Sequence, residues 1–273
     1  MLAIDPSAKI APSAVIGNDV EIGPYCVVGP NVAIGDGCKL VAQVHIAGHT
    51  TIGPGTTIYP FASLGTPPQS VHYRGGPTKL VIGARCQLRE SVTINIGTED
   101  GGGTTTVGDE CFLMVGAHVG HDCQVGRNVI IANNTMLGGH CHVGDYVFLG
   151  GHCAIHQNVR IGESAMVAGY SAFADDVIPF GFVLQPVARL AGVNVVGMRR
   201  RGVGKDAIRA VQQTYGLLFE DEGEGEFAAR IERAEQQFGS VPEVARIVAF
   251  LRAGKRRPIM LAKVRGRRDA EAG

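Results

Sequence analysis

The 273-residue sequence predicts a mainly β protein in which a parallel β-helix precedes a small helical domain. Three observations predict this fold class. Aliphatic residues recur every six positions over most of residues 10–173. Glycine, with 39 residues, is about twice as frequent as in an average protein. After residue 185 the six-residue period gives way to apolar spacings of three and four, which are typical of helices.

The six-residue period runs without a break through residues 10–64, resumes at 82–94 and again at 107–173, and gives 25 positions in phase. Neither a helix with 3.6 residues per turn nor an alternating strand has this period. Three six-residue units form one triangular coil, with the aliphatic side chain inside the prism. Hexapeptide repeats of this kind coil left-handed, although the period alone does not give the hand.

Glycine and cysteine each hold one place in the repeat. Glycine follows the aliphatic residue at 14 of the 25 positions, and we expect it to allow a tight corner in which φ is often positive. Every cysteine stands four residues after an aliphatic residue, where other repeats carry a small or β-branched side chain. We therefore interpret them as small buried residues rather than as a metal, redox or disulfide framework. They are Cys26, Cys38, Cys86, Cys111, Cys123, Cys141 and Cys153.

Two segments interrupt the period and predict loop excursions, at 65–80 and 98–106. Long loops on rigid scaffolds are often functional, and the second loop fits a plain flexible bulge equally well. With these two excursions included, the β-helix domain is predicted to span 1–185 and the helical domain 186–273.

The helical domain is predicted to contain three helices, at 205–219, 226–238 and 242–252. Pro242 stands in the first turn of the last one, where proline is tolerated. We expect the helices to lie against the end of the solenoid and to cover its open strand edges. The last ten residues are expected to be frayed.

The net charge of zero is unevenly distributed along the chain. Residues 1–198 carry nine basic and 14 acidic side chains, whereas residues 199–273 carry 16 and 11. This mildly basic tail suits an acidic protein partner but is too weak for a dedicated nucleic-acid binder. No signal-peptide pattern and no run of 18 apolar residues occurs, so we expect no membrane span and a cytoplasmic location.

Histidines are concentrated in one stretch, since six of the nine fall within residues 118–156. Histidine is the side chain whose ordinary pKa lies nearest neutrality. Because three six-residue units make one coil, residues three units apart should lie on neighbouring coils. We therefore expect His121 beside Gly139 and Asp122 beside His140. A general base, a carboxylate and an exposed backbone N–H would then share one face of the prism.

Other histidines are explained as well by structure as by chemistry. His118 and His142 flank inward aliphatic residues, and these two and His152 suit structural or subunit-contact roles. A single prism face is convex and cannot enclose a substrate, so a second copy has to supply the other wall. We therefore expect a cyclic homotrimer with active sites at its interfaces.

Six runs of residues carry a more specific resemblance: RESVTINIGT (89–98), YRGGPTKLVIG (73–83), GAHVGHDCQVG (116–126), LGGHCHVGD (137–145), AIHQN (154–158) and GVNVVGMRRRG (192–202). Together they make essentially the whole chain similar to the UDP-N-acetylglucosamine acyltransferase family. The resemblance implies transfer of a 3-hydroxyacyl chain from acyl carrier protein to the 3-hydroxyl of UDP-N-acetylglucosamine. That reaction begins lipid A synthesis in Gram-negative bacteria, and the family performs it as a homotrimer without a metal or another cofactor.

The resemblance also implies residue roles. His121 would be the general base, Asp122 would orient it, and the Gly139 N–H would hold the developing oxyanion. The basic tail would bind the acidic carrier protein. The substrate-binding positions would be Ser70, His72, His118, His140, His156, Gln157, Asn194, Arg200 and Arg201, and the acyl-chain ruler Met166 and Gly169.

The sequence departs from the family pattern on the acceptor side. Ser70 stands where an aspartate contacts the sugar, and His72 stands where the family has a lysine. Val196 replaces an acidic residue, and Asn95-Ile96 replaces a His-Arg pair. These departures leave open N-acyl transfer to a 3-amino UDP-sugar analogue.

The same scaffold is compatible with three alternative functions. Another hexapeptide acyltransferase using acyl-CoA would not need the helical tail or the 192–202 run. A zinc lyase of the γ-carbonic anhydrase type would hold stoichiometric metal on interfacial histidines. A non-enzymatic scaffold would give no reason for histidine and aspartate to crowd on stacked coils.

Overall fold

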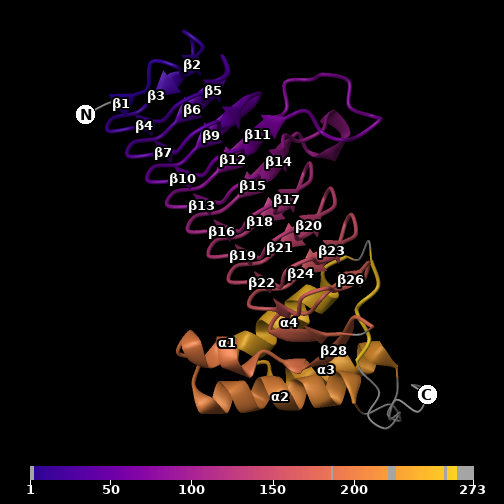
Figure 1. Cartoon of the computed structure of the whole chain (residues 1–273). Coiled ribbons are helices and arrows are strands. Elements are labelled where there is room, and N and C mark those ends of the chain that lie inside the picture. Colours follow the sequence, from indigo (N-terminus) through magenta and orange to yellow (C-terminus); the bar gives the residue numbers. More distant parts are fainter. Residues whose placement is uncertain (1–2, 186, 221–225, 255–256, 263–273) are drawn as a thin grey trace, which may run out of the picture.

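Three parallel sheets form the sides of a triangular prism in the computed structural model, which describes residues 3–185, 187–220, 226–254 and 257–262 (Figure 1). Each strand pairs with the strand one coil further along the chain. Ala3, for example, pairs with Glu21, so the spacing is the three six-residue units that the sequence predicts. The predicted β-helix is confirmed.

The sheets contain 28 strands among the described residues. The first sheet holds β1 (Ala3–Ile4), β4 (Glu21–Ile22), β7 (Lys39–Leu40), β10 (Thr57–Ile58), β13 (Gln87–Leu88), β16 (Phe112–Leu113), β19 (Ile130–Ile131), β22 (Phe148–Leu149), β25 (Met166–Val167), β27 (Gly181–Leu184) and β28 (Arg189–Val193). The second holds β2 (Lys9–Ile10), β5 (Val27–Val28), β8 (His45–Ile46), β11 (Ser63–Thr66), β14 (Thr93–Asn95), β17 (His118–Val119), β20 (Met136–Leu137), β23 (Ala154–Ile155) and β26 (Ala172–Phe173). The third holds β3 (Val15–Ile16), β6 (Val32–Ile34), β9 (His49–Ile52), β12 (Lys79–Ile82), β15 (Thr104–Val107), β18 (Gln124–Val125), β21 (His142–Val143) and β24 (Arg160–Ile161).

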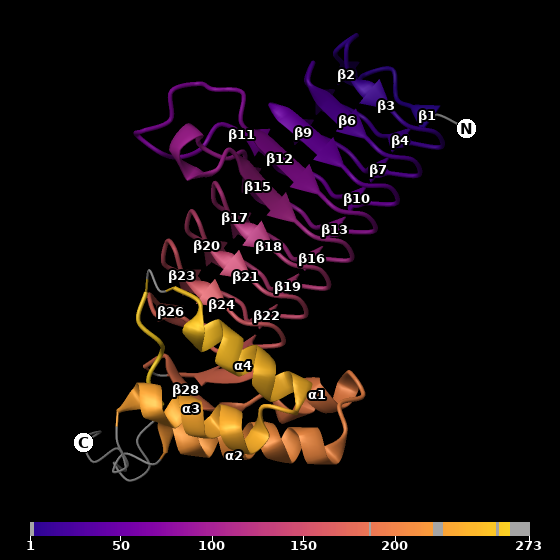
Figure 2. The same cartoon turned by 180° about the vertical axis from the view of Figure 1, so that it is seen from behind.

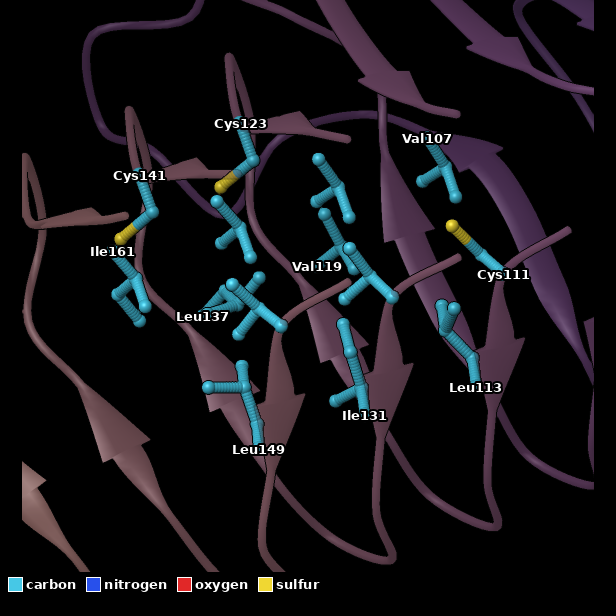
Figure 3. Packing of buried hydrophobic residues seen from close by; sticks show 14 of the residues in the cluster. Val107, Cys111, Leu113, Val119, Cys123, Ile131, Leu137, Cys141, Leu149 and Ile161 are labelled. Atoms are coloured by element: carbon cyan, nitrogen blue, oxygen red, sulfur yellow. The ribbon is translucent and has the colours of Figure 1, made fainter. Parts of the chain in front are cut away.

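The repeated aliphatic side chains fill the prism, as Figure 3 shows for Leu113, Ile131 and Leu149 on successive coils. All seven cysteines are buried free thiols, which confirms their interpretation as small core residues. Cys123 Sγ donates to the Gly138 carbonyl at 3.1 Å, so the thiol also joins neighbouring coils. Burial raises the pKa of the Cys123 thiol well above its ordinary value, because a thiolate is poorly solvated there.

The expectation that the repeat glycine has positive φ is wrong. Of the 14 glycines that follow an aliphatic residue, only Gly65 has it, at 73°. The repeat glycine is needed because the next coil comes very close: a Cβ on Gly23 would overlap the Val41 carbonyl oxygen. Positive φ occurs two residues later, mostly on other residue types, including Asp122 at 59° and His140 at 61°. These two residues therefore occupy the same left-handed turn position on successive coils.

Both loop excursions lengthen a coil. Thr57 pairs with Gln87 instead of Gly75, because the loop between β11 and β12 lies between them. Gln87 pairs with Phe112 instead of Thr105, because a loop with a short 3-10 helix, η1 (Glu99–Gly101), follows β14. The two loops contact each other through an N–H of the first, at position 76, which donates to Glu99 Oε1 at 2.7 Å.

Four α-helices of the described residues lie at the C-terminal end of the solenoid (Figures 1 and 2): α1 (Val195–Arg200), α2 (Lys205–Phe219), α3 (Phe227–Phe238) and α4 (Pro242–Arg252). The last three agree with the predicted helices to within one residue. Helix α1 is absent from the sequence prediction, because it is only six residues long. Tyr215 of α2 donates to the Leu190 carbonyl of β28 at 3.1 Å, which ties the helices to the last strand.

Strand β28 pairs antiparallel with β27 and completes the first sheet. The described segment 257–262 then returns along this end, where Met260 N–H donates to the Asp176 carbonyl at 2.9 Å. The expected fraying of the last ten residues concerns a segment outside the described residues. No helix in the described part of the chain is long and apolar enough to cross a membrane.

Candidate active site

A histidine and a carboxylate are paired on the turn between β17 and β18. His121 Nδ1 lies 2.8 Å from Asp122 Oδ2, and the two residues are only 9% and 3% exposed. His140 occupies the turn one coil on, with its ring edge-on to His121 at a centroid distance of 4.9 Å. Its Nδ1 lies 3.9 Å from Asp122 Oδ2. The predicted stacking of Asp122 beside His140 is thereby confirmed.

The Asp122 carboxylate determines the tautomer of His121. An ionised carboxylate only accepts hydrogen bonds, so the His121 nitrogen beside it must carry a proton. The Nδ1–H then donates to Asp122, and Nε2 keeps its lone pair. His121 can therefore accept a proton at Nε2.

Gly139 lies against the His121 ring, as the stacking of coils predicts. A Cβ on Gly139 would lie 2.6 Å from His121 Nε2. No residue that the structure describes accepts a hydrogen bond from the Gly139 N–H. The lone pair of Nε2 and an available backbone donor are thus close neighbours.

The place that Gly139 holds in the repeat binds carboxylates on another corner of the prism, between the third and first sheets. There the backbone N–H points outward, and the acceptor is an aspartate of the next coil. The three donor–acceptor pairs, at 2.7 to 3.0 Å, are Asn18 with Asp36, Ala84 with Asp109, and Arg127 with Asp145. One coil beyond Gly139 stands Gln157, which carries no charge. The Gly139 N–H therefore has a place in the repeat where other N–H groups bind a carboxylate, but the residue that follows it by one coil carries no charge.

Two pockets meet at His121. The larger, of about 460 Å³, is lined by Ser70, His72 and Thr98 from the loops and by His121, His140 and Gln157 from the coils. The other, of about 250 Å³, includes Asn95, His118, His121, Gly139 and Gln157. The structure thus brings together seven of the predicted substrate-binding and catalytic residues around His121. Ser70, His72 and Asn95, which differ from the family pattern, line the walls of these pockets.

His118 donates to or accepts from Thr93 Oγ1 through Nδ1 at 2.8 Å. Burial lowers the pKa of His118 below its ordinary value of 6.5, and the nearby His121 lowers it further. Below pH 6.5, His118 therefore binds a proton more readily in the unfolded chain than in the folded chain.

We expect the free energy of unfolding to fall as pH drops through that interval, and His118→Gln to remove part of the fall. The measurement is urea unfolding of both proteins at about pH 7.5 and about pH 5.5, at one protein concentration. An equal loss of stability in the wild type and in His118→Gln would contradict the pKa shift of His118. His45→Gln is the control, because His45 is exposed on β8.

His156 stands on the same corner of the prism as His121, beside the pocket residue Gln157, although it lines neither pocket. Other predicted residues lie elsewhere on the prism. Asn194 caps α1, and its Nδ2 donates to the Ser164 carbonyl at 2.9 Å. Arg201 pairs with Glu163 at 2.7 Å and lies over the Tyr146 ring. These contacts are on the corner between the third and first sheets, whereas His121 is on the corner between the second and third.

Arg200, Met166 and Gly169 are also separate from the His121 pockets. Arg200 is an exposed residue of α1. Met166 lies on β25, and Gly169 on the turn that follows. None of the three lines either pocket described above.

Sequence reasoning did not find two residues at the site. The backbone N–H of Thr98 donates to both Asp122 oxygens, and its hydroxyl donates to Oδ2 at 2.6 Å. Arg257 donates to the carbonyl of the pocket residue Gln157 at 3.0 Å and to His156 Nδ1 at 2.6 Å. Neither could be found by counting along the repeat, because the second loop lengthens the coil that carries Thr98, and Arg257 comes from beyond the solenoid.

By distance alone, His121, Asp122 and His140 could also surround a metal ion, since their ligand atoms lie within 4.8 Å of one another. Thr98, however, already directs two donor groups at the carboxylate. The donors around Asp122 therefore suit an orienting carboxylate better than a metal ligand.

The sequence and the fold match known proteins over nearly the whole chain. Residues 176–260 match the family model described as Udp N-acetylglucosamine O-acyltransferase, Domain 2, and residues 13–48 and 104–139 match the bacterial transferase hexapeptide model. The acyl-[acyl-carrier-protein]–UDP-N-acetylglucosamine O-acyltransferase of Azorhizobium caulinodans is 52% identical over 94% of both chains. That of Caulobacter vibrioides is 44% identical over 95% of this chain and 98% of its own.

Solved structures agree with these matches. The UDP-N-acetylglucosamine acyltransferase of Campylobacter jejuni superimposes with a TM-score of 0.89 at 35% identity, over 95% of this chain and 100% of its own. The Arabidopsis enzyme gives a TM-score of 0.83 at 30% identity, over 94% and 99%. The predicted fold class, a left-handed parallel β-helix followed by helices, is confirmed, and the chain belongs to the UDP-N-acetylglucosamine O-acyltransferase family.

Proposed function

We propose that this protein transfers a 3-hydroxyacyl chain from acyl carrier protein to the 3-hydroxyl of UDP-N-acetylglucosamine, the first step of lipid A synthesis. One observation carries the proposal in a chain of this family. His121, paired with Asp122 at 2.8 Å, presents Nε2 beside the Gly139 backbone where two pockets meet. A base and an oxyanion donor on either side of a reacting carbonyl are what acyl transfer requires.

The reaction follows from these groups. His121 Nε2 takes the proton of the sugar 3-hydroxyl as that oxygen bonds to the thioester carbonyl carbon. The carbonyl electrons move to its oxygen, and the Gly139 N–H binds the resulting oxyanion. When the carbonyl re-forms, the carbon–sulfur bond breaks, and the proton on His121 passes to the departing sulfur. The products are the ester and the free thiol of the carrier.

In this proposal the complete active site forms at the interface between two copies of a homotrimer. The residues expected at the nucleotide and the acyl chain, such as Arg201 and Met166, lie on other parts of the prism than His121. A convex prism cannot bring its corners together, but a threefold arrangement of copies can. Arg200 and Arg201 would then face the diphosphate, which guanidinium groups bind well. A cytoplasmic location completes the proposal, since seven buried free thiols suit a reducing compartment.

The test is a steady-state assay that crosses donors with acceptors. The acyl donors are 3-hydroxyacyl carrier proteins of several chain lengths and the matching acyl-CoA, and the acceptors are UDP-N-acetylglucosamine and its 3-amino analogue. We expect ester formation from the carrier protein, unaffected by a chelator that removes zinc. Exclusive amide formation, a preference for acyl-CoA, or stoichiometric zinc whose removal abolishes activity would each overturn the proposal. Sedimentation of the same sample tests the trimer.

A further inference from the structure

The glycine-rich loop after β14 closes around the Asp122 carboxylate. A Cβ on Gly97 would lie 2.8 Å from Asp122 Oδ1, and one on Gly101 would overlap Oδ2 and lie 2.6 Å from His140 Cε1. Only residues without a side chain allow the backbone to approach this closely. The loop therefore has a specific place in the site and is not merely a flexible bulge.

Thr98 provides the contacts of this loop to the carboxylate. Its N–H lies 3.0 Å from Oδ1 and 3.1 Å from Oδ2, and its hydroxyl lies 2.6 Å from Oδ2. The Asp122 side chain has no exposed surface, and Thr98 itself is 7% exposed. A carboxylate this deeply buried needs donors from the protein, because water does not reach it.

The loop is itself held in place. Thr78 Oγ1 donates to the Gly97 carbonyl at 2.6 Å, and the Gly97 N–H donates to the Lys79 carbonyl at 3.1 Å. The Thr98 carbonyl accepts from Gly103 N–H at 3.0 Å. Thr98 is thus fixed from both sides before any substrate binds, which is the requirement for precise positioning.

We propose that Thr98 is a positioning residue that acts through Asp122 on His121. Its two donors hold the carboxylate in the one orientation in which Oδ2 also accepts from His121 Nδ1. Without the hydroxyl, the carboxylate loses its shortest hydrogen bond and turns to find another donor. His121 Nε2 then leaves its place beside Gly139. This inference rests on the acyl transfer proposed above.

The experiment compares Thr98→Val with Thr98→Ser by kcat and by KM for UDP-N-acetylglucosamine. Valine has the shape of threonine without the hydroxyl, and serine keeps the hydroxyl. Because hydrogen bonds to charged groups are the strong ones, we expect Thr98→Val to lower kcat by about 10- to 100-fold with KM changed by less than about twofold. Thr98→Ser should stay within about threefold of the wild type.

Two controls separate positioning from structure. Thr135→Val removes a fully buried hydroxyl that bonds the Gly150 carbonyl away from Asp122, and should lower stability while kcat is unchanged. In an Asp122→Asn background, Thr98→Val should change kcat by less than about twofold, because residues that act in series are not additive. Gly101→Ala keeps the hydroxyl but crowds Oδ2, and should also lower kcat; it is a second test if Thr98→Val does not fold.

Several results would overturn the inference. They are an unchanged kcat in both Thr98→Val and Gly101→Ala, a rise in KM alone, and an undiminished Thr98→Val effect on the Asp122→Asn background. Failure of the proposed function would look different, since the wild type itself would then form no ester.

Discussion

Replacing His121 with alanine is expected to lower kcat for acyl transfer by about 10²- to 10⁴-fold or more, because the variant loses its general base. The loss should exceed that of a binding residue, since no other described side chain is both paired with Asp122 at 2.8 Å and adjacent to Gly139. The measurement is kcat and KM with carrier-protein donor at saturating UDP-N-acetylglucosamine. We expect KM to change little, because the base acts in the transition state.

The variant should fold and assemble normally. The next coil binds this turn through the backbone, where His140 N–H donates to the His121 carbonyl at 2.9 Å. That bond does not involve the imidazole. The control is His45→Ala, on an exposed position of β8, which should keep full activity. A folded His121→Ala variant with nearly wild-type kcat would show that another group takes the proton.

Replacing Gly139 with alanine is the second change with a large expected effect. The added Cβ would lie 2.6 Å from His121 Cε1 and from Nε2, so the ring has to move. The backbone N–H remains, and the variant therefore tests the position of the base rather than the presence of the oxyanion donor. A displacement of about 1 Å at reacting groups costs on the order of 10²-fold in rate, which is the loss of kcat that we expect.

Gly216→Ala is the matched control, since a Cβ there meets only Glu220 Oε2, at 3.8 Å. It should keep wild-type kcat and raise the unfolding temperature slightly, because alanine is the better helix former. Both variants are compared by steady-state kinetics and thermal unfolding. If Gly139→Ala retains wild-type kcat, the His121 ring does not work in the place where the structure puts it.

The sequence predicts the fold well because the repeat is locally encoded. The period continues in phase from 107 to 173, so counting three units alone pairs His121 with Gly139 and Asp122 with His140. The same counting cannot predict Thr98, since the loop after β14 lengthens its coil and shifts the partner of Gln87 to Phe112. A loop conformation depends on contacts that are distant in sequence, and no period reports them.

Backbone conformation is the other gap. The period identifies which residue is at each place of the repeat, but it does not report dihedral angles. Composition alone therefore assigns glycine to the left-handed position, which in fact belongs two residues further on to Asp122, His140 and others. Helix α1 is not predicted, because it is too short to show an apolar period. Only its capping residue marks it in the sequence: the Asn194 side chain accepts a hydrogen bond from Gly197 N–H at 2.9 Å.

The left-handed turn position separates the stability of this protein from its chemistry. Neighbouring coils are joined there by backbone hydrogen bonds, such as Asn158 N–H to the Gly139 carbonyl at 3.0 Å, and by inward aliphatic side chains. Many side chains at the same position, such as the exposed Tyr25 and Phe61, point outward and take part in neither. At such exposed turns, residues can be exchanged with little effect on the stack that presents them, so a single scaffold can acquire a new activity without first having to be restabilised.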